Sequence, residues 1–362
     1  DRQGVSSETE EPATLKPATA DSVAPKKATT KASRLRTEVR ERGVMGGTLN
    51  LSTIGNPKRL NPILSNESVS NRVLSIMFKT CFSFDYREQE LRPALCEMVA
   101  QNEVGTEFIY TLRDGLKWSD GHPLTSADVA FSYKVLSDPA LKTYSRDLFV
   151  QAKDRRGRHT LPVLEILDER RFKIVLQEAN QQFHLIASTM PIIPKHEWEE
   201  AYKAGDFVKL SSPKTIRLPI VGSGPFFLTS YEIDDELVLK RNQHYWKADQ
   251  DGQQLPYLSG VRIHIHRDLM MSHVRFSESE THIHDVRAAE YSRLMRKRQQ
   301  GKWQIQDLGP SHSTNYLMFN LDPVSRRAPK NETAYRRSWF RDVMFRRAIS
   351  HAIDREGLIR NI

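Results

Sequence analysis

The chain has 362 residues, 38% of them hydrophobic and 9% aromatic, and a formal net charge of +9. This is ordinary for a folded globular protein, and the length allows two or three domains. No stretch approaches the about 20 consecutive apolar residues that a membrane-spanning helix needs. The basicity is local, since residues 287–362 hold 16 Lys+Arg against 7 Asp+Glu. The run "RLMRKRQQGK" (293–302) indicates a solvated basic face or, alternatively, a phosphate-binding stripe that lacks interleaved aromatic residues.

Along the chain, residues 1–45 come first and contain almost nothing to bury. Their Ala, Thr, Pro, Lys and Glu composition predicts a disordered tether. Ordered structure is expected from "GGTLNLSTI" (46–54), where Leu49 and Leu51 alternate with polar residues as in a strand. The same reasoning predicts further strands at 107–112, 171–177, 236–240, 261–266 and 316–321.

Helical patterns alternate irregularly with these strands. In "LTSADVAFSYKVL" (124–136), Thr125 and Asp128 have the spacing of a capping box. An amphipathic helix is predicted over 342–359, with Phe345, Ala348, Ile349, Ala352 and Ile353 on one face. The irregular alternation favours several mixed sheets over one doubly wound domain.

Two cysteines, Cys81 and Cys96, lie in settings without CxxC or Cys/His ligand spacing. This pattern indicates neither a disulfide framework nor a zinc site. We expect both to be buried packing residues.

No catalytic motif is complete. "VGSGPF" (221–226) has glycines directly beside Ser223 and not the Gly-x-Ser-x-Gly spacing of a nucleophile elbow, so it predicts a tight turn with Gly222 and Gly224 at positive φ. "HEWEE" (196–200) lacks the second histidine of a zinc-protease helix. No phosphate-binding loop is present either, and the chain is not expected to be an enzyme.

Five of the chain's 12 histidines fall between positions 264 and 284. His264 and His266 would share one face of the 261–266 strand, and with His282 and His284 they could bind a transition metal if the segments meet. A hydrogen-bonded polar face explains these histidines equally well.

Eight blocks occur in an order and at spacings typical of one protein family. They are "GGTLNLS", "RLNPILSNES", "LRPALCEMV", "YTLRDGLKWSDGHPLTSADVAFSY", "VGSGPFFLTSYEIDDELVLKRNQHYW", "LPYLSGVRIHI", "NYLMFNLDP" and "FRDVMFRRAISHAIDRE". From about residue 46 to its last residue, the chain resembles the family 5 extracellular solute-binding proteins, the oligopeptide- and dipeptide-binding receptors of ABC importers. Small departures are Cys96, where the family usually has Ala, and Thr80-Cys81, where it has Gly-Leu.

The resemblance implies a mixed α/β (α+β) fold of the periplasmic-binding-protein type II kind, multi-lobed, with mixed sheets and a hinge. Residues 46–78 and 190–268 would form a discontinuous domain I, residues 79–189 domain II, and residues 269–362 the start of an incomplete domain III. Family members usually continue beyond the "AIDRE" helix. We therefore expect a C-terminally truncated chain in which the apolar face of that helix lacks part of its cover.

Within domain II, the segment 112–133 is expected to be a folding signature and not a ligand site. Asp114-Gly115 and Asp120-Gly121 are turn dipeptides, and Trp118 between them is a large apolar plug.

The function that the resemblance implies is capture of a peptide or similar small solute by closing lobes, without catalysis or a cofactor. Peptides are bound in this way through main-chain hydrogen bonds. By position after the "LNP" block, the candidate segment is Asn66, Glu67 and Ser68; Tyr316 and Asn320 are candidates from the opposing lobe. An ordinary polar loop is the alternative for both groups.

The partners implied are the solute and an ABC transporter permease in the inner membrane, with no nucleic acid. The receptor would be a monomer in the periplasm or cell envelope, and residues 1–45 are what a removed export signal and a surface tether would leave. Two alternatives remain: a metal- or haem-binding receptor on the same scaffold, favoured by the histidines, and a basic interaction module around 287–302.

Overall fold

The computed structural model describes residues 35–37, 42–85, 89–141, 143, 145–151, 160–298, 303–306, 316–321 and 338–361. The chain divides into two compact units, Asp1–His284 and Asp285–Ile362. Within the described residues, the first unit contains two four-stranded sheets with helices packed on them. The predicted mixed α/β architecture with several sheets is therefore confirmed.

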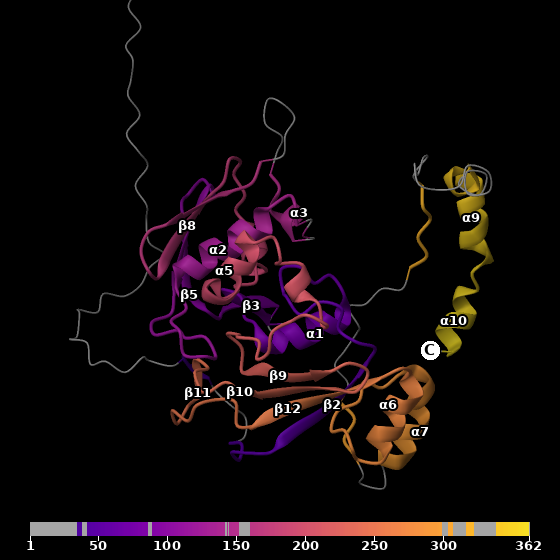
Figure 1. The fold of residues 1–362 in the computed structure, drawn as a ribbon. Coiled ribbons are helices and arrows are strands. Elements are labelled where there is room, and N and C mark those ends of the chain that lie inside the picture. The colour runs from indigo at the N-terminus through magenta and orange to yellow at the C-terminus, as the bar shows by residue number, and fades with distance from the viewer. Residues whose placement is uncertain are drawn as a thin grey trace, which may run out of the picture. The chain divides into compact units, whose positions relative to one another are not determined.

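One sheet has the strand order β2-β12-β10-β9 and joins segments far apart in the sequence (Figure 1). β2 (Thr48–Ile54) runs parallel to β12 (Gly260–His266), whereas β10 (Glu236–Arg241) is antiparallel to both β12 and β9 (Phe226–Glu232). The strands predicted at 46–54, 236–240 and 261–266 are confirmed. Their alternation also gives the buried side chains correctly, among them Leu237, Leu239, Val261, Ile263 and Ile265.

The other sheet has the order β5-β6-β8-β7 and is antiparallel throughout. Its strands are β5 (Cys96–Gln101), β6 (Glu107–Leu112), β7 (Val163–Ile166) and β8 (Arg171–Val175). Tyr110 and Phe172 are cross-strand partners whose rings stack with centroids 5.1 Å apart. The strands predicted at 107–112 and 171–177 are confirmed, the second ending two residues early.

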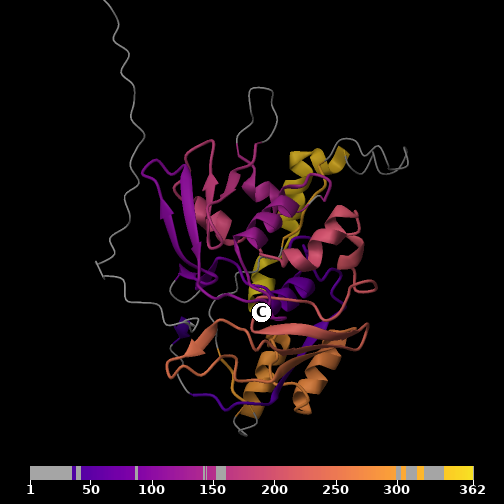
Figure 2. The same ribbon diagram turned by 60° about the vertical axis from the view of Figure 1, so that its left-hand side comes forward.

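Helices pack beside both sheets (Figure 1, Figure 2). α2 (Ser126–Ser137) contacts β7 and α5 (Lys195–Lys203), α1 (Ser68–Met77) contacts β9, and α6 (Leu269–Ser277) contacts β2 and β12. Shorter helical segments are α3 (Arg146–Phe149), α4 (Phe183–Ser188) and the 3-10 segment η1 (Lys209–Ser211). None of the helices in the described part of the chain combines the length and apolar character needed to cross a bilayer.

The start of α2 shows the predicted capping box. Oδ2 of Asp128 accepts the backbone N–H of Thr125 at 2.9 Å, and the Thr125 side chain caps the first turn in return. The Asp-Gly turns before this helix are also present, with φ of +65° at Gly115 and +93° at Gly121, and Trp118 between them is fully buried. The turns, the buried Trp118 and the capped helix of this segment are as predicted, whereas the expectation that it holds no ligand site stays a prediction.

Two small sheets complete the first unit. β3 (Phe82–Asp85) pairs antiparallel with β4 (Glu90–Pro93), and β1 (Leu35–Thr37) pairs parallel with β11 (Lys247–Asp249). The disordered tether predicted over 1–45 is therefore wrong at Leu35–Thr37, where the backbone pairs with β11. Residues 1–34 and 38–41 lie outside the described residues.

Cys81 and Cys96 form a disulfide, which corrects the expectation of two unpaired packing residues. The β3–β4 hairpin lies between them and returns the chain, so that their Cα atoms are 4.5 Å apart. Both residues are buried, as predicted. The pairing was missed because a bridge closed by a hairpin leaves no short cysteine spacing in the sequence.

The expected division into domains I, II and III stays a prediction. One four-stranded sheet is formed by residues 48–54 and 226–266, and the other by residues 96–175. Both lie in the first unit, which ends at His284.

The second unit includes α7 (Ala288–Arg298), α9 (Val343–Ala352) and α10 (Arg355–Asn361). The single helix predicted over 342–359 is wrong in extent, because Asp354 accepts the N–H of Gly357 at 2.8 Å and begins a new helix. The strand predicted at 316–321 is also wrong. No strand lies within the described residues of this unit, so the segment has no strand to pair with there.

The apolar face of α9 is only partly covered. The rings of Phe319, Trp339 and Phe340 contact Phe345, but no residue of α9 is buried, and Ala348 and Ala352 are exposed.

Candidate functional site

The candidate ligand-binding segment, residues 66–68, emerges from a buried turn. Asn61 of the "LNP" block is fully buried, and its Oδ1 accepts the N–H of Ile63 at 3.0 Å. This side-chain hydrogen bond fixes the turn that precedes the segment. Asn66 and Ser68 are exposed beyond it, at the start of α1.

The side chain of Glu67 is the N-cap of α1. Its carboxylate accepts the backbone N–H groups of Ser70 (2.9 Å), Val69 (3.2 Å) and Lys58 (3.1 Å), as well as the Ser70 hydroxyl. Burial works to raise the pKa of Glu67, but these hydrogen bonds outweigh it and hold the pKa below its usual value. The carboxylate is thus ionised, and its hydrogen-bonding capacity is used to cap the start of α1.

The main chain beside Glu67 is open. Among the described residues, neither the N–H nor the C=O of Asn66 has a hydrogen-bond partner, and the N–H of Ser68 has none. Ser68 is the first residue of α1, where backbone N–H groups have no partner within the helix. The segment therefore offers two donors and one acceptor from the main chain.

Tyr316 and Asn320 belong to the second unit. Tyr316 is 74% exposed and Asn320 is exposed as well. Both lie in the irregular segment 316–321, and their role in ligand binding stays a prediction.

The two histidines of β12 are individually engaged. His264 Nδ1 lies 3.7 Å from a carboxylate oxygen of Glu236, and His266 Nε2 lies 3.2 Å from the hydroxyl of Ser52. Burial, followed by the charge of Arg275, lowers the pKa of both imidazoles. Both imidazoles therefore favour the neutral form. His266 is buried and within hydrogen-bond distance of Ser52, whereas the separation of His264 from Glu236 is too long for a hydrogen bond.

The other two candidates, His282 and His284, make contacts of their own. His282 accepts the backbone N–H of Asn50 on its Nδ1 at 2.8 Å, and the ring of His284 stacks on Phe276 with centroids 5.3 Å apart. Within the described residues, no three of His264, His266, His282 and His284 bring their ligand atoms together. The four-histidine metal hypothesis is therefore not supported.

The "VGSGPF" segment is a close-packed junction with the end of α1. A Cβ at Gly222 would lie 2.3 Å from the carbonyl oxygen of Met77, and one at Gly224 would lie 2.1 Å from that of Ile76. Neither glycine has a positive φ, which corrects the predicted reason for their presence. Ser223 is buried and its Oγ accepts the N–H of Lys79 at 2.9 Å. The serine holds the junction in place.

The family model described as "Bacterial extracellular solute-binding proteins, family 5 Middle" matches residues 90–362. The chain belongs to this family. The resemblance seen in the sequence blocks is thereby confirmed for three quarters of the chain.

This family 5 protein is similar to curated relatives, of whose length it covers only a part. It is 24% identical over 324 residues to a "Probable ABC transporter-binding protein" of Deinococcus radiodurans, covering 87% of this chain and 52% of the relative. It is 25% identical over 219 residues to the oligopeptide-binding protein OppA of Bacillus subtilis, covering 56% and 37%. The chain thus spans about half or less of the length of these relatives.

Solved structures of binding proteins share the fold. The binding protein MelB of Agrobacterium fabrum, in complex with stachyose, matches with a TM-score of 0.69 and 22% identity over 87% of this chain and 49% of its own. The oligopeptide-binding protein AppA of Bacillus subtilis, in complex with a nonapeptide, matches with a TM-score of 0.58 and 20% identity over 70% and 46%. The fold of this family 5 protein is that of the type II periplasmic binding proteins.

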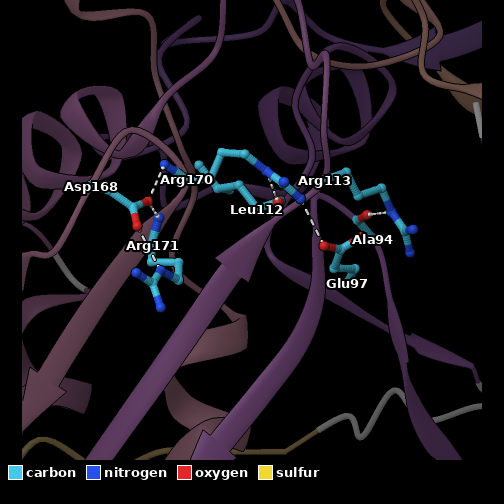
Figure 3. A network of polar contacts seen from close by, with 7 residues as sticks. All are labelled: Ala94, Glu97, Leu112, Arg113, Asp168, Arg170 and Arg171. Carbon is cyan, nitrogen blue, oxygen red and sulfur yellow. Dashed lines mark hydrogen bonds and ion pairs between the residues drawn. The ribbon is translucent and has the colours of Figure 1, made fainter. Parts of the chain in front are cut away.

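In this family 5 protein, a network of arginine side chains holds the strand ends next to segment 112–133, the folding signature (Figure 3). Arg170 donates from Nε to the carbonyl of Leu112 at 3.0 Å and from Nη2 to Glu97 at 2.8 Å. Arg113 donates from Nε to the carbonyl of Ala94 at 2.5 Å. The end of β6 and the start of β5 are thereby held together.

A group of cations around Trp246 was not predicted. Arg113 Cζ and Lys247 Nζ lie 5.3 and 5.2 Å from centroids of the Trp246 ring system. Burial, together with the charge of Lys247, lowers the pKa of Lys79 to about 8. Arg113 and Lys79 lie so far in the sequence from Trp246 and Lys247 that no spacing pattern could reveal the group.

Proposed function

We propose that the chain captures a small solute, with short peptides as the leading class, for delivery to the permease of an ABC importer. The observation that carries the proposal is the open main chain of Asn66 and Ser68 next to a Glu67 side chain that is engaged as a helix cap. Membership of the solute-binding family and the oligopeptide-binding relative support the transport role.

The arrangement suits a peptide because it offers main-chain groups in an extended stretch. Glu67 has φ −126° and ψ 150°, which is strand-like backbone. An extended ligand can pair with such a stretch through its own N–H and C=O groups, which every residue type shares. Affinity would then depend little on the ligand's side chains.

The proposed role is binding without chemistry. Ser223, the one serine in a nucleophile-like sequence context, is 1% exposed and its Oγ already accepts a hydrogen bond. A buried, engaged hydroxyl is not positioned to attack a bound solute.

The proposed location is outside the inner membrane. The Cys81–Cys96 disulfide supports it, because disulfides persist in oxidising compartments such as the periplasm. Anchoring through residues 1–45 remains part of the proposal, to be tested by membrane fractionation of cells that express the protein with and without that segment.

The decisive experiment is Ser68→Pro. Proline is favoured at the first position of a helix and needs an extended preceding residue, which Glu67 already is. The substitution therefore removes one N–H donor while leaving α1 intact. With tetra-alanine as the probe in isothermal titration calorimetry, we expect about tenfold weaker binding, the size of one lost hydrogen bond.

Ser68→Ala is the matched control, since it removes the hydroxyl and keeps the N–H. Its affinity for tetra-alanine should equal that of the unchanged chain. Equal binding by the proline and alanine variants would contradict the main-chain mechanism, and absence of tetra-alanine binding by the unchanged chain would contradict the peptide class.

An oligosaccharide is the second candidate ligand. It is favoured by the similarity to MelB, which was solved in complex with stachyose and covers 87% of this chain. Stachyose titrated in parallel distinguishes the two, and we expect no binding of it. Tyr316→Ala, in the second unit, tests with either probe whether that exposed ring contributes to binding.

A further inference from the structure

Asp120, His122 and His196 form a cluster on the first unit, away from residues 66–68 in the sequence. Oδ2 of Asp120 lies 2.9 Å from Nδ1 of His122 and 2.8 Å from Nε2 of His196. One ligand atom from each of the three residues lies within 4.8 Å of those of the other two. Two imidazoles and a carboxylate thus converge on one point.

Local structure positions each member. The Asp120-Gly121 turn, with φ of +93° at Gly121, brings His122 back over Asp120, and the N–H of His122 donates to Oδ1 of the same aspartate at 3.1 Å. His196 is the second residue of α5, which begins directly after Pro194. The two imidazole rings stack with centroids 4.3 Å apart and planes at 29°. The turn and the helix are therefore already held in a converging arrangement.

A third imidazole lies beside the turn. A Cβ at Gly121 would be 3.3 Å from Nε2 of His244.

The neighbouring acid Asp128 is already engaged, since its carboxylate accepts the backbone N–H groups of Thr125 and Lys195.

The spacing suits a small transition-metal ion. In a tetrahedral zinc site with ligand distances of about 2.0–2.1 Å, the ligand atoms lie about 3.3 Å from one another. The carboxylate-to-imidazole distances of 2.8 and 2.9 Å need to open by only about half an ångström to reach that value. This adjustment is within reach of side-chain rotation, because His122 is 60% exposed.

We infer that Asp120, His122 and His196 form a binding site for a divalent transition-metal ion such as Zn²⁺. Two imidazole nitrogens and one carboxylate oxygen are the donor types that zinc, copper and nickel prefer, whereas calcium and magnesium require mainly oxygen. A bound ion would tie the 118–124 turn to the start of α5. The site is independent of solute capture, and its ligand is the metal alone.

The test is titration of the whole chain with Zn²⁺ after removal of metals with EDTA, measured by isothermal titration calorimetry without peptide. We expect a Zn²⁺-binding event that is weakened at least about tenfold in His122→Ala, in His196→Ala and in Asp120→Asn. His351→Ala is the matched control, since it removes an exposed imidazole from α9 and should leave this event unchanged. Circular dichroism of the metal-free variants checks that each is folded.

Electron paramagnetic resonance with Cu²⁺ gives a second readout. The unchanged chain should show coupling to two imidazole nitrogens, and His122→Ala should reduce it to one. Absence of Zn²⁺ binding, or binding and nitrogen coupling that are unaffected in His122→Ala, would overturn the inference. Neither result bears on tetra-alanine binding, so the failure of this site and the failure of the proposed function are distinguishable.

Discussion

The junction between residues 222–224 and the end of α1 makes Gly224→Ala a sharp test of the packing. Gly224 donates its N–H to the carbonyl of Met77 at 2.7 Å, and both residues are buried. An added Cβ would lie 2.1 Å from the carbonyl oxygen of Ile76 and 2.8 Å from that of Met77. The methyl group would thus overlap the first oxygen by more than about 1 Å.

The expected loss follows from two contributions. Over-packing costs about 1–3 kcal/mol, and weakening the hydrogen bond to a buried carbonyl costs about 1–3 kcal/mol more. We expect Gly224→Ala to lower the free energy of unfolding by about 3 kcal/mol or more. Urea denaturation followed by circular dichroism should show this as a midpoint about 1 M lower or more.

Gly55→Ala is the comparison variant. Gly55 has φ +75° but no atom within 4 Å of an added Cβ, so only backbone strain of about 1 kcal/mol is expected. If Gly224→Ala lost no more stability than Gly55→Ala, the close approach of the two backbones would not be the reason for glycine at 224.

Three further outcomes are expected from unfolding measurements. Replacing Cys81 and Cys96 together by Ser should cost about 3 kcal/mol, because the bridge spans 15 positions, and a reducing agent should destabilise only the unchanged chain. Lys79→Met should stabilise the fold near neutral pH, because the folded state pays to hold the Lys79 charge. The shift of the Lys79 pKa from 10.5 to about 8 corresponds to a destabilisation of roughly 3 kcal/mol, which partial solvent contact reduces to about 1–2 kcal/mol. The unfolded chain binds the Lys79 proton more tightly than the folded chain, so the stability of the unchanged chain should rise with pH from about 8. The stability advantage of Lys79→Met should then vanish above about pH 10.5. A difference between the two proteins that does not change with pH would contradict the lowered pKa of Lys79. Glu67→Ala should cost about 1 kcal/mol near neutral pH, and because the folded pKa of Glu67 is lowered, this difference should disappear as the pH falls from 4.5 through that lower value.

Local patterns in the sequence predicted part of the first unit, namely β2, β6, β8, β10, β12 and α2. The alternation in β6, β8, β10 and β12 and the capping box of α2 are local signals, and the structure agrees with them within a few residues. The 316–321 segment shows the limit of this reasoning. An alternating pattern specifies a strand only where a partner strand exists, and the described part of the second unit offers none.

Long-range contacts explain what could not be predicted. "HEWEE" was set aside because it lacks a second histidine, yet the turn at Asp120-Gly121 supplies one from position 122. The need for glycine at 222 and 224 arises from the backbone of α1, well over a hundred positions earlier. At residues 66–68 the position was predicted from the family resemblance, whereas the capping role of Glu67 was recognised only from the structure.

The parallel pairing of β2 with β12 has a consequence for synthesis on the ribosome. Ser52 is the partner of His264, so β2 leaves the exit tunnel long before β12, its neighbour in the sheet among the described strands, is made. During that interval the edge of β2 lacks its native neighbour and is open to chaperones or to association with other nascent chains. All strands of the β5-β6-β8-β7 sheet are synthesised after β2 and before β12, so this sheet can form first. β2 can then be enclosed beside it once β12 has been made.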